Sequence, residues 1–157
     1  MTPYFISVFF HIVFAAFWLG SMLTLPLVIL PAIRNHADRV RILYDTGLKL
    51  RFWGWVSLVG LLVTGLLNMH FRGLSINFDL FTANRYGILI SYKLLIFITI
   101  IIISAVHDFY LGGKAIEEME KMRNDKAKKV ARYSGRLMLL LALAAAFFGV
   151  AASRGGF

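Results

Sequence analysis

A few ionisable side chains lie within or beside strongly apolar stretches, and they are the residues of this chain that could carry chemistry. Lys93 lies inside the stretch Tyr86–Leu111, which closes with His107 and Asp108, and His11 lies inside another apolar stretch near the N-terminus. An ammonium in hydrocarbon costs about 2.5 to 3.5 kcal/mol on insertion scales, so Lys93 indicates a functional site with a partner. Imidazole groups ligate metals and carry protons.

Lys93 and His11 match in depth. Each lies about seven residues from the outer end of its stretch, which is about 10 Å at 1.5 Å per residue. We therefore predict an outer site that holds both. His107 lies on nearly the same helix face as Lys93 but about 21 Å away along the axis, so we predict a second, inner site at His107 and Asp108. The alternatives are that Lys93 only snorkels to the outer head groups and that His107 and Asp108 only stabilise a helix end.

Two further residues extend the predicted outer site. Trp18 follows His11 by two helical turns on the same face, so its indole is expected beneath the imidazole. His70 stands at the outer end of the second apolar stretch, but about 200° around the helix from Asn68, so it is expected to point away from the interior. The candidate cofactor-binding residues are His11, Lys93, Trp18 and His70, of which His70 ranks below His11 as an interior ligand.

The elements that must position these residues are membrane helices. The chain has 157 residues, of which 59% are hydrophobic, against about 45–50% in soluble domains. Four apolar segments, at about 4–33, 52–69, 86–111 and 137–153, are long enough to cross a hydrocarbon core of about 30 Å. We predict an all-α fold, an integral membrane four-helix bundle that forms a single domain over residues 1–157. The N-terminus is interpreted as a retained first helix and not as a signal peptide.

The basic residues indicate topology. Linkers 34–51 and 112–136 hold five and eight of the 17 Lys and Arg residues, whereas the opposite ends of the helices hold Arg72, Arg85 and Arg154. The positive-inside rule places both linkers in the cytoplasm and both termini outside, in a bacterial-type inner (plasma) membrane. The net charge of +9 is thus a topology signal, and it does not predict nucleic-acid binding. The predicted partner is the lipid bilayer, including anionic lipids.

Other patterns concern packing. Ser57, Gly60, Thr64 and Asn68 recur on one side of the second segment, which is typical of close helix packing in lipid. Pro26 is expected to bend the inner end of the first helix. The linker 112–136 is expected to be partly helical, and the alternation of apolar and polar residues over 74–80 predicts an extended segment over the mouth of the bundle. With no cysteine in the chain, disulfides and thiolate metal sites are excluded.

One stretch resembles a known family. Residues 82–94, TANRYGILISYKL, are similar to the third-helix entry of the copper resistance protein D (CopD) family, T-x-x-x-Y-G-x-L-x-x-x-K-L. His11 followed by Trp18-Leu19-Gly20, and Arg51-Phe52 followed by Thr64-Gly65, also fit that family. The architecture is similar to that of the HemJ-type protoporphyrinogen oxidases, too. That resemblance implies haem b held by the first-helix histidine, His11, with Lys93 as the third-helix lysine.

These residues support two metal hypotheses. In the first, the chain is a b-type haem redox or electron-transfer protein, with a haem-dependent membrane oxidoreductase as its enzymatic form and a quinone or another redox partner as its expected partner. His11 is then an axial ligand, and Lys93 pairs with a propionate or ligates iron as a free amine. In the second, implied by the CopD resemblance, the protein binds or transports copper with His11, His70, Met22 and Met69 as ligands. A third interpretation is a structural subunit of a homo-oligomer or larger membrane complex.

Overall fold

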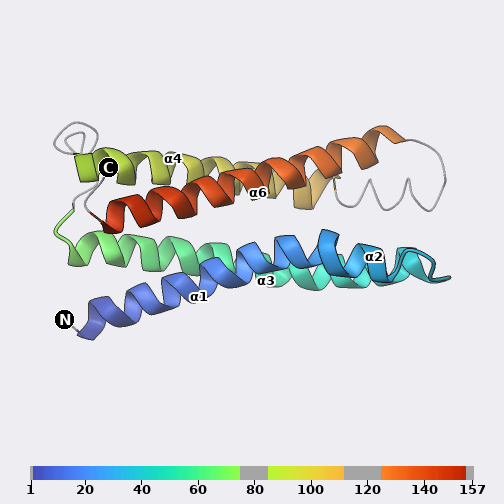
Figure 1. The fold of residues 1–157 in the computed structure, drawn as a ribbon, viewed down its shortest axis with the longest axis horizontal. Helices are drawn as coiled ribbons and strands as arrows, with labels where there is room; N and C mark the ends of the chain where they lie inside the picture. Colours follow the sequence, from blue (N-terminus) through green and yellow to red (C-terminus); the bar gives the residue numbers. More distant parts are fainter. Residues whose placement is uncertain (1, 75–84, 112–124, 155–157) are drawn as a thin grey trace.

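The fold consists of helices throughout the part of the chain that is described. The computed structural model describes residues 2–74, 85–111 and 125–154. The first helix comprises α1 (Thr2–Thr24), the π-helical segment η1 (Leu25–Ile29) and α2 (Leu30–Ala32). It is followed by α3 (Arg39–Phe71), then by α4 (Arg85–Val106), which continues into the π-helical segment η3 (His107–Leu111), and finally by α6 (Asp125–Ser153) (Figure 1).

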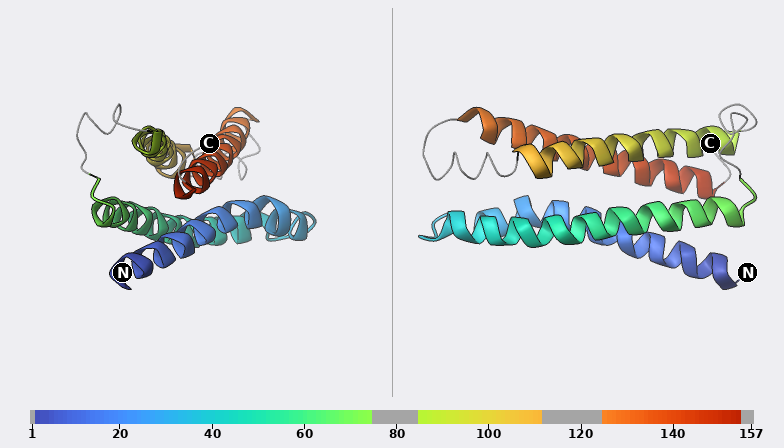
Figure 2. Two further views of the ribbon diagram at one scale, coloured as in Figure 1. Left: turned by 60° about the vertical axis from the view of Figure 1, so that its left-hand side comes forward. Right: turned by 180° about the vertical axis from the view of Figure 1, so that it is seen from behind.

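The helices form two antiparallel pairs. The first helix packs along α3, and α4 packs along α6, and the two pairs lie side by side in both views of Figure 2. Because each helix reverses direction relative to the one before, α1 begins and α6 ends at the same end of the bundle (Figure 1). We call this the outer end, and the opposite end, where α3 and α6 begin, the inner end.

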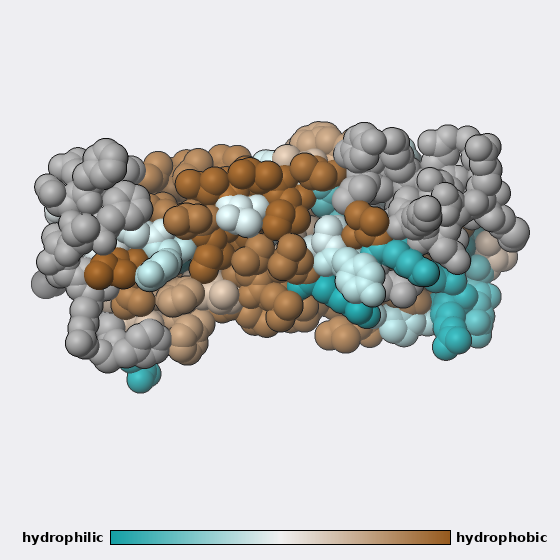
Figure 3. All heavy atoms as spheres, turned by 90° about the horizontal axis from the view of Figure 1, so that it is seen from above, coloured by the Kyte–Doolittle hydropathy of each residue, from teal (hydrophilic) through white to brown (hydrophobic). Residues whose placement is uncertain are grey.

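Four helices in the described ranges are long and apolar enough to cross a membrane, over Pro3–Ala32, Arg39–Phe71, Gly87–Phe109 and Tyr133–Ser153. The predicted all-α fold with four membrane helices is thereby confirmed. Large apolar side chains cover the outside, among them Phe5, Leu95 and Leu140. Figure 3 shows an apolar zone across the middle of one face and hydrophilic residues gathered toward one end, as expected for a bundle whose middle lies in lipid.

The predicted helix boundaries were wrong at the inner end. The second helix was predicted over 52–69 after a linker 34–51, but α3 begins at Arg39, thirteen residues earlier than predicted. Arginine and lysine are good helix formers, and a helix needs no lipid around its charged turns, so apolar content alone underestimates its length. α6 begins at Asp125, inside the linker 112–136, in agreement with the prediction that this linker is partly helical. Residues 112–124 and the predicted extended segment lie outside the described residues, apart from Leu74.

The core joins all four helices near mid-height. Trp18, Leu58, Ile100 and Ala142, one from each helix, are buried together, and Ile100 is 2% exposed. Close approach of the first pair depends on Gly60 of α3, because a Cβ built there would lie 2.5–2.7 Å from three ring atoms of Phe14. The small-residue face predicted on α3 therefore does pack against a neighbouring helix.

The inner end of the first helix departs from α geometry at its prolines. Pro26 lies in η1, and Pro31 lies in the short α2. Proline has no N–H to donate and crowds the preceding turn, so the helix widens locally into π geometry. The perturbation predicted at this end is thus present, as a π-helical turn.

Candidate functional site

The outer site is built on His11 of α1. Its Nδ1 lies 2.8 Å from Oγ1 of Thr64 on α3, and that hydroxyl donates its proton to the carbonyl oxygen of Gly60 at 2.6 Å. A threonine hydroxyl has one hydrogen, so Thr64 can only accept from the imidazole. Nδ1 therefore carries the proton in neutral His11, and Nε2 presents a lone pair. An acceptor behind Nδ1 is the usual arrangement behind a metal-ligating histidine.

Lys93 of α4 faces that lone pair. Its Nζ lies 3.5 Å from Nε2 of His11, at the outer limit of a hydrogen bond. The structure thus brings together the two residues that were matched by depth in the sequence, and it does so across the boundary between the two helix pairs. Behind the ammonium, Gly149 of α6 leaves room, because a Cβ there would lie 3.2 Å from Nζ. All four helices therefore contribute to the outer site.

Polar groups one turn further out complete its surroundings. Ser7 of α1 donates to the carbonyl oxygen of Thr64 at 3.3 Å, which ties α1 to α3 beside the imidazole. Asn68 of α3 has a buried Oδ1 with no hydrogen-bond partner among the described residues. Buried polar atoms are nearly always paired, so this amide oxygen can accept a hydrogen bond from a group bound beside the cluster.

The other predicted outer residues lie elsewhere. Trp18 is buried in the four-helix core, two turns below His11. His70 is exposed near the end of α3, where its ring lies 5.9 Å from that of Phe71. Met22 packs against the core, eleven residues from His11 on the same helix and so about 16 Å away by helix rise. Met69 is buried at the outer end of α3.

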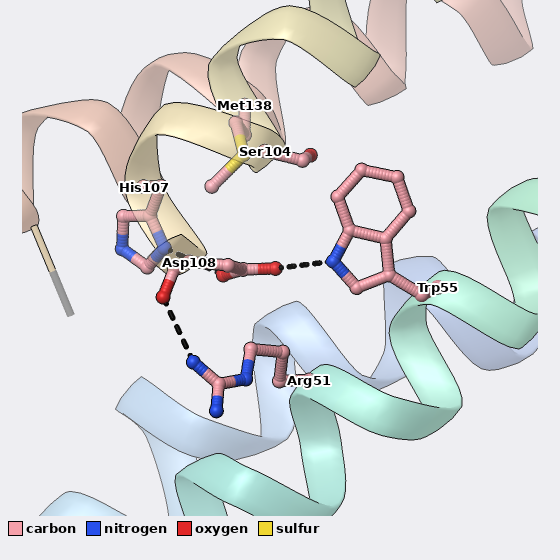
Figure 4. Close-up of polar contacts among 6 residues, drawn as sticks. All are labelled: Arg51, Trp55, Ser104, His107, Asp108 and Met138. Carbon is pink, nitrogen blue, oxygen red and sulfur yellow. Dashed lines mark hydrogen bonds and ion pairs between the residues drawn. The ribbon is translucent and has the colours of Figure 1, made fainter. Parts of the chain in front are cut away.

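The inner site is a network around Asp108 in η3 (Figure 4). Its Oδ1 lies 3.0 Å from Nδ1 of His107, and its Oδ2 accepts from Nε1 of Trp55 at 3.0 Å. Its main-chain oxygen accepts from Arg51 at 2.9 Å. These bonds connect α4 and η3 to α3, in the other helix pair. His107 and Asp108 therefore form the predicted pair, with two partners from a distant part of the chain.

The sequence did not identify Thr64, Arg51 or Trp55 as site residues. Thr64 was assigned to a packing face, although its spacing from Asn68 and Ser57 placed it toward the interior. Arg51 and Trp55 are separated from Asp108 by 57 and 53 residues, so their contacts depend on how α3 and α4 align in depth. The one available signal was that Arg51, Trp55 and His107 all stand at the inner ends of apolar segments.

The donor set limits what the outer site can bind. It offers one imidazole lone pair and one amine, and no group of three or more His, Asp or Glu side chains occurs among the described residues. A bare copper ion held by the protein alone needs more soft donors than this. A haem iron receives four nitrogens from its macrocycle and needs only axial ligands from the protein. Among the described residues the outer site thus offers one imidazole and one amine, which are too few donors to hold an isolated ion.

Comparison with known proteins places this architecture in a family. The family model described as "Copper resistance protein D" matches residues 49–154, which include Thr64, Lys93 and the inner site, and which exclude α1 with His11. An uncharacterized protein of Aquifex aeolicus (strain VF5) is 31% identical over 144 residues, which cover 90% of each chain. No solved structure matches. The chain is therefore a multi-pass membrane protein, and it belongs to the copper resistance protein D (CopD) family.

Proposed function

We propose that the protein is a b-type haem-binding redox protein of the membrane, with its haem site in the outer half of the bundle. The observation that carries this proposal is the contact between His11 and Thr64. Nδ1 lies 2.8 Å from a hydroxyl that lies 2.6 Å from the carbonyl oxygen of Gly60, which favours the proton on Nδ1 and leaves Nε2, facing the boundary between the helix pairs, as the proposed ligand atom. A single imidazole of this kind is sufficient as an axial haem ligand, whereas it is insufficient for an isolated metal ion.

Each residue of the outer site has a role in this proposal. His11 ligates the iron, and Thr64 holds the imidazole ring in the ligating orientation. Lys93 approaches from the other helix pair, where it pairs with a propionate as an ammonium or ligates iron as a free amine. The absence of a side chain at Gly149 leaves room for Nζ of Lys93 itself. Haem would supply reversible one-electron chemistry.

The membrane orientation is part of the proposal. We place the protein in a bacterial inner membrane with the inner end of the bundle in the cytoplasm, because Arg34, Arg39 and Arg41 stand at that end. The chain has no cysteine, so single cysteines report orientation directly. In intact cells, a membrane-impermeant thiol reagent should label Arg154→Cys and should label His36→Cys only after permeabilisation. The reverse pattern would contradict the orientation.

An absorption spectrum of the purified protein tests the haem proposal. We expect a Soret band and, on reduction, an α band, both of which disappear in His11→Ala and persist in His70→Ala, an exposed histidine that serves as the control. One further variant separates the two roles proposed for Lys93. Lys93→Arg keeps a cation for a propionate but cannot ligate iron, so it preserves the spectrum in the first case and changes it in the second. A protein that remains colourless after expression with excess haem would refute the proposal.

Copper binding is the second candidate, because the family to which the chain belongs is described by copper resistance. The proposed copper ligands are His11 with Met22, Met69 and His70. Their separation is the physical objection, and the nearby Lys93 ammonium would also repel a cation. A colourless protein that binds stoichiometric Cu(I), and that loses it in Met22→Leu or Met69→Leu, would favour copper over haem. A colourless protein that binds neither would leave a structural subunit of a larger membrane complex as the remaining hypothesis.

A further inference from the structure

The inner site contains an imidazole with one nitrogen held and the other available. Nδ1 of His107 lies 3.0 Å from Oδ1 of Asp108, and a carboxylate can only accept, so Nδ1 carries a proton. Asp108 is itself held by Trp55 through its other carboxylate oxygen and by Arg51 through its main chain. The ring of His107 is thus oriented, and its Nε2 has no hydrogen-bond partner among the described residues. We call His107 and Asp108 the inner dyad.

The inner dyad can complement either a donor or an acceptor. When His107 is neutral, Nε2 accepts from an O–H group. When it is protonated, Nε2 donates to a carbonyl oxygen, and Asp108 balances the charge. A ligand that exchanges an O–H group for a C=O group as it is oxidised would therefore find a matching partner in both states.

Aromatic surfaces adjoin the dyad and face the lipid. The rings of Trp55 and Phe109 lie 5.9 Å apart at an interplanar angle of 37°, and Phe109 is 74% exposed. The guanidinium of Arg51 lies 5.9 Å from the centre of the Phe109 ring. Phe109 is also the last residue of the candidate membrane span Gly87–Phe109, so the aromatic pair stands at the inner end of that span.

The position of the dyad in a π-helical turn is a further sign of function. The segment η3 begins at His107 and interrupts the regular α4. Such turns cost helix stability and occur frequently at functional sites. On its other side the end of α4 is anchored to α6, because the hydroxyl of Ser104 donates to the sulfur of Met138 at 3.2 Å (Figure 4). The dyad is therefore held from α3 on one side and from α6 on the other.

We propose that the inner dyad and the Trp55–Phe109 pair bind the head group of a membrane quinone. A quinone is flat and aromatic, dissolves in the bilayer, and presents carbonyl oxygens when oxidised and hydroxyl groups when reduced. Its ring would pack on the exposed face of Phe109, and one of its oxygens would hydrogen-bond to Nε2 of His107. The physiological meaning of this site rests on the proposed redox function, because a quinone would be the electron partner of the outer site. The binding geometry is independent of it.

Quenching of tryptophan fluorescence tests the proposal. A quinone quenches indole emission on contact, and Trp55 belongs to the site, whereas Trp53 is exposed on the outside of α3. We would titrate the full chain in detergent with 2-methyl-1,4-naphthoquinone. Saturable quenching is expected in the wild type and in Trp53→Phe, and its saturable part should be lost in Trp55→Phe. Quenching that rises linearly and equally in both tryptophan variants would mean partition into the micelle only and would overturn the proposal.

Substitutions of the dyad test the hydrogen bond. His107→Ala should lower the affinity for the quinone at least about tenfold, because a polar contact is lost. His107→Gln keeps a polar group at the position and should restore part of that affinity. If His107→Ala does not fold, Asp108→Asn provides the second test. This variant keeps an acceptor for Trp55 but removes the charge that balances a protonated His107. It should therefore lower the affinity for the oxidised quinone. Unchanged affinity in these variants would overturn the proposal.

The outer site provides the control that separates the two proposals. His11 lies on another helix and near the opposite end, so His11→Ala should abolish haem binding and leave the saturable quenching intact. A protein without haem that still binds the quinone would refute the proposed function alone. A protein with haem that shows no saturable quenching would refute the quinone site alone.

Discussion

Replacing Thr64 by valine is the most direct test of how the outer site is assembled. The two side chains have nearly the same shape, so the substitution removes one oxygen and leaves the packing of a residue that is only 7% exposed. Three hydrogen bonds are lost, one from Nδ1 of His11 at 2.8 Å and two from the shared hydroxyl proton to the carbonyl oxygens of Gly60 at 2.6 Å and Leu61 at 3.4 Å. Only the first of these concerns the proposed ligand.

A matched variant isolates that bond. Thr99 of α4 donates to the carbonyl oxygen of Leu95 at 2.9 Å, in the same way that Thr64 donates to Gly60, and it has no histidine partner among the described residues. The difference in the free energy of unfolding between Thr64→Val and Thr99→Val therefore measures the cost of leaving the N–H of His11 without an acceptor. Such a group costs about 1 to 3 kcal/mol of folding free energy. Loss of the residue that orients a metal ligand typically weakens metal binding about 10- to 100-fold.

Two assays read these quantities separately. Unfolding by sodium dodecyl sulfate in mixed micelles, followed by tryptophan emission, gives the difference in the free energy of unfolding. Titration of the haem-free protein with haem, followed at the Soret band, gives the affinity. Thr64→Ser restores the oxygen and should recover both properties.

The outcome is decisive in either direction. If Thr64→Val and Thr99→Val have equal stability, the hydrogen bond between His11 and Thr64 does not contribute and the tautomer argument fails. If Thr64→Val is less stable but binds haem as well as Thr99→Val, the hydrogen bond exists and His11 is not the ligand that it orients.

Three further predictions use the same assays, with Gly20→Ala as the common control because a Cβ there meets nothing within 4 Å. Gly60→Ala should be about 1 to 3 kcal/mol less stable than that control, since its methyl group would overlap the Phe14 ring, and equal stability would show that the ring moves aside freely. Gly149→Ala should lower haem affinity with little loss of stability, because the added Cβ lies 3.2 Å from Nζ of Lys93; unchanged affinity would place the ammonium outside the site. Lys93→Met should lose the native absorption spectrum. Its free energy of unfolding should be about 1 to 3 kcal/mol higher than that of the wild type, because a cation is removed from the membrane interior. A less stable variant would indicate a structural role for Lys93.

The fold was largely predictable from the sequence because lipid imposes a simple rule. An apolar run of sufficient length must be a helix in a membrane, since every backbone polar group has to be satisfied within the segment. That rule does not apply where a helix extends into water, and the predicted start of the second helix was wrong there. Arg39 and the turns that follow it are helical through propensity and through continuity with the segment beyond, which a count of apolar residues cannot detect.

The sites were predictable only where the depth of two residues in their membrane helices is enough to predict that they are in contact. Counting residues from the ends of two segments brought His11 and Lys93 to the same level, and their nitrogens lie 3.5 Å apart. Depth does not give the rotation of a helix about its axis, so the partnership between His11 and Thr64 was not predicted. The same limitation applies to Trp55 and Asp108, whose contact requires both the depth and the rotation of α3 and η3.

The division of the bundle into two helix pairs has a consequence for the order of biosynthesis. His11 and Thr64 both belong to the first pair, so the imidazole can be oriented when 71 residues have entered the membrane, before Lys93 has entered it. The first hairpin would thus emerge with a ligand prepared, and the second hairpin would close over it. In the proposed haem protein, haem capture would then be a step in maturation, and the interval between the two insertions would be the time available for loading.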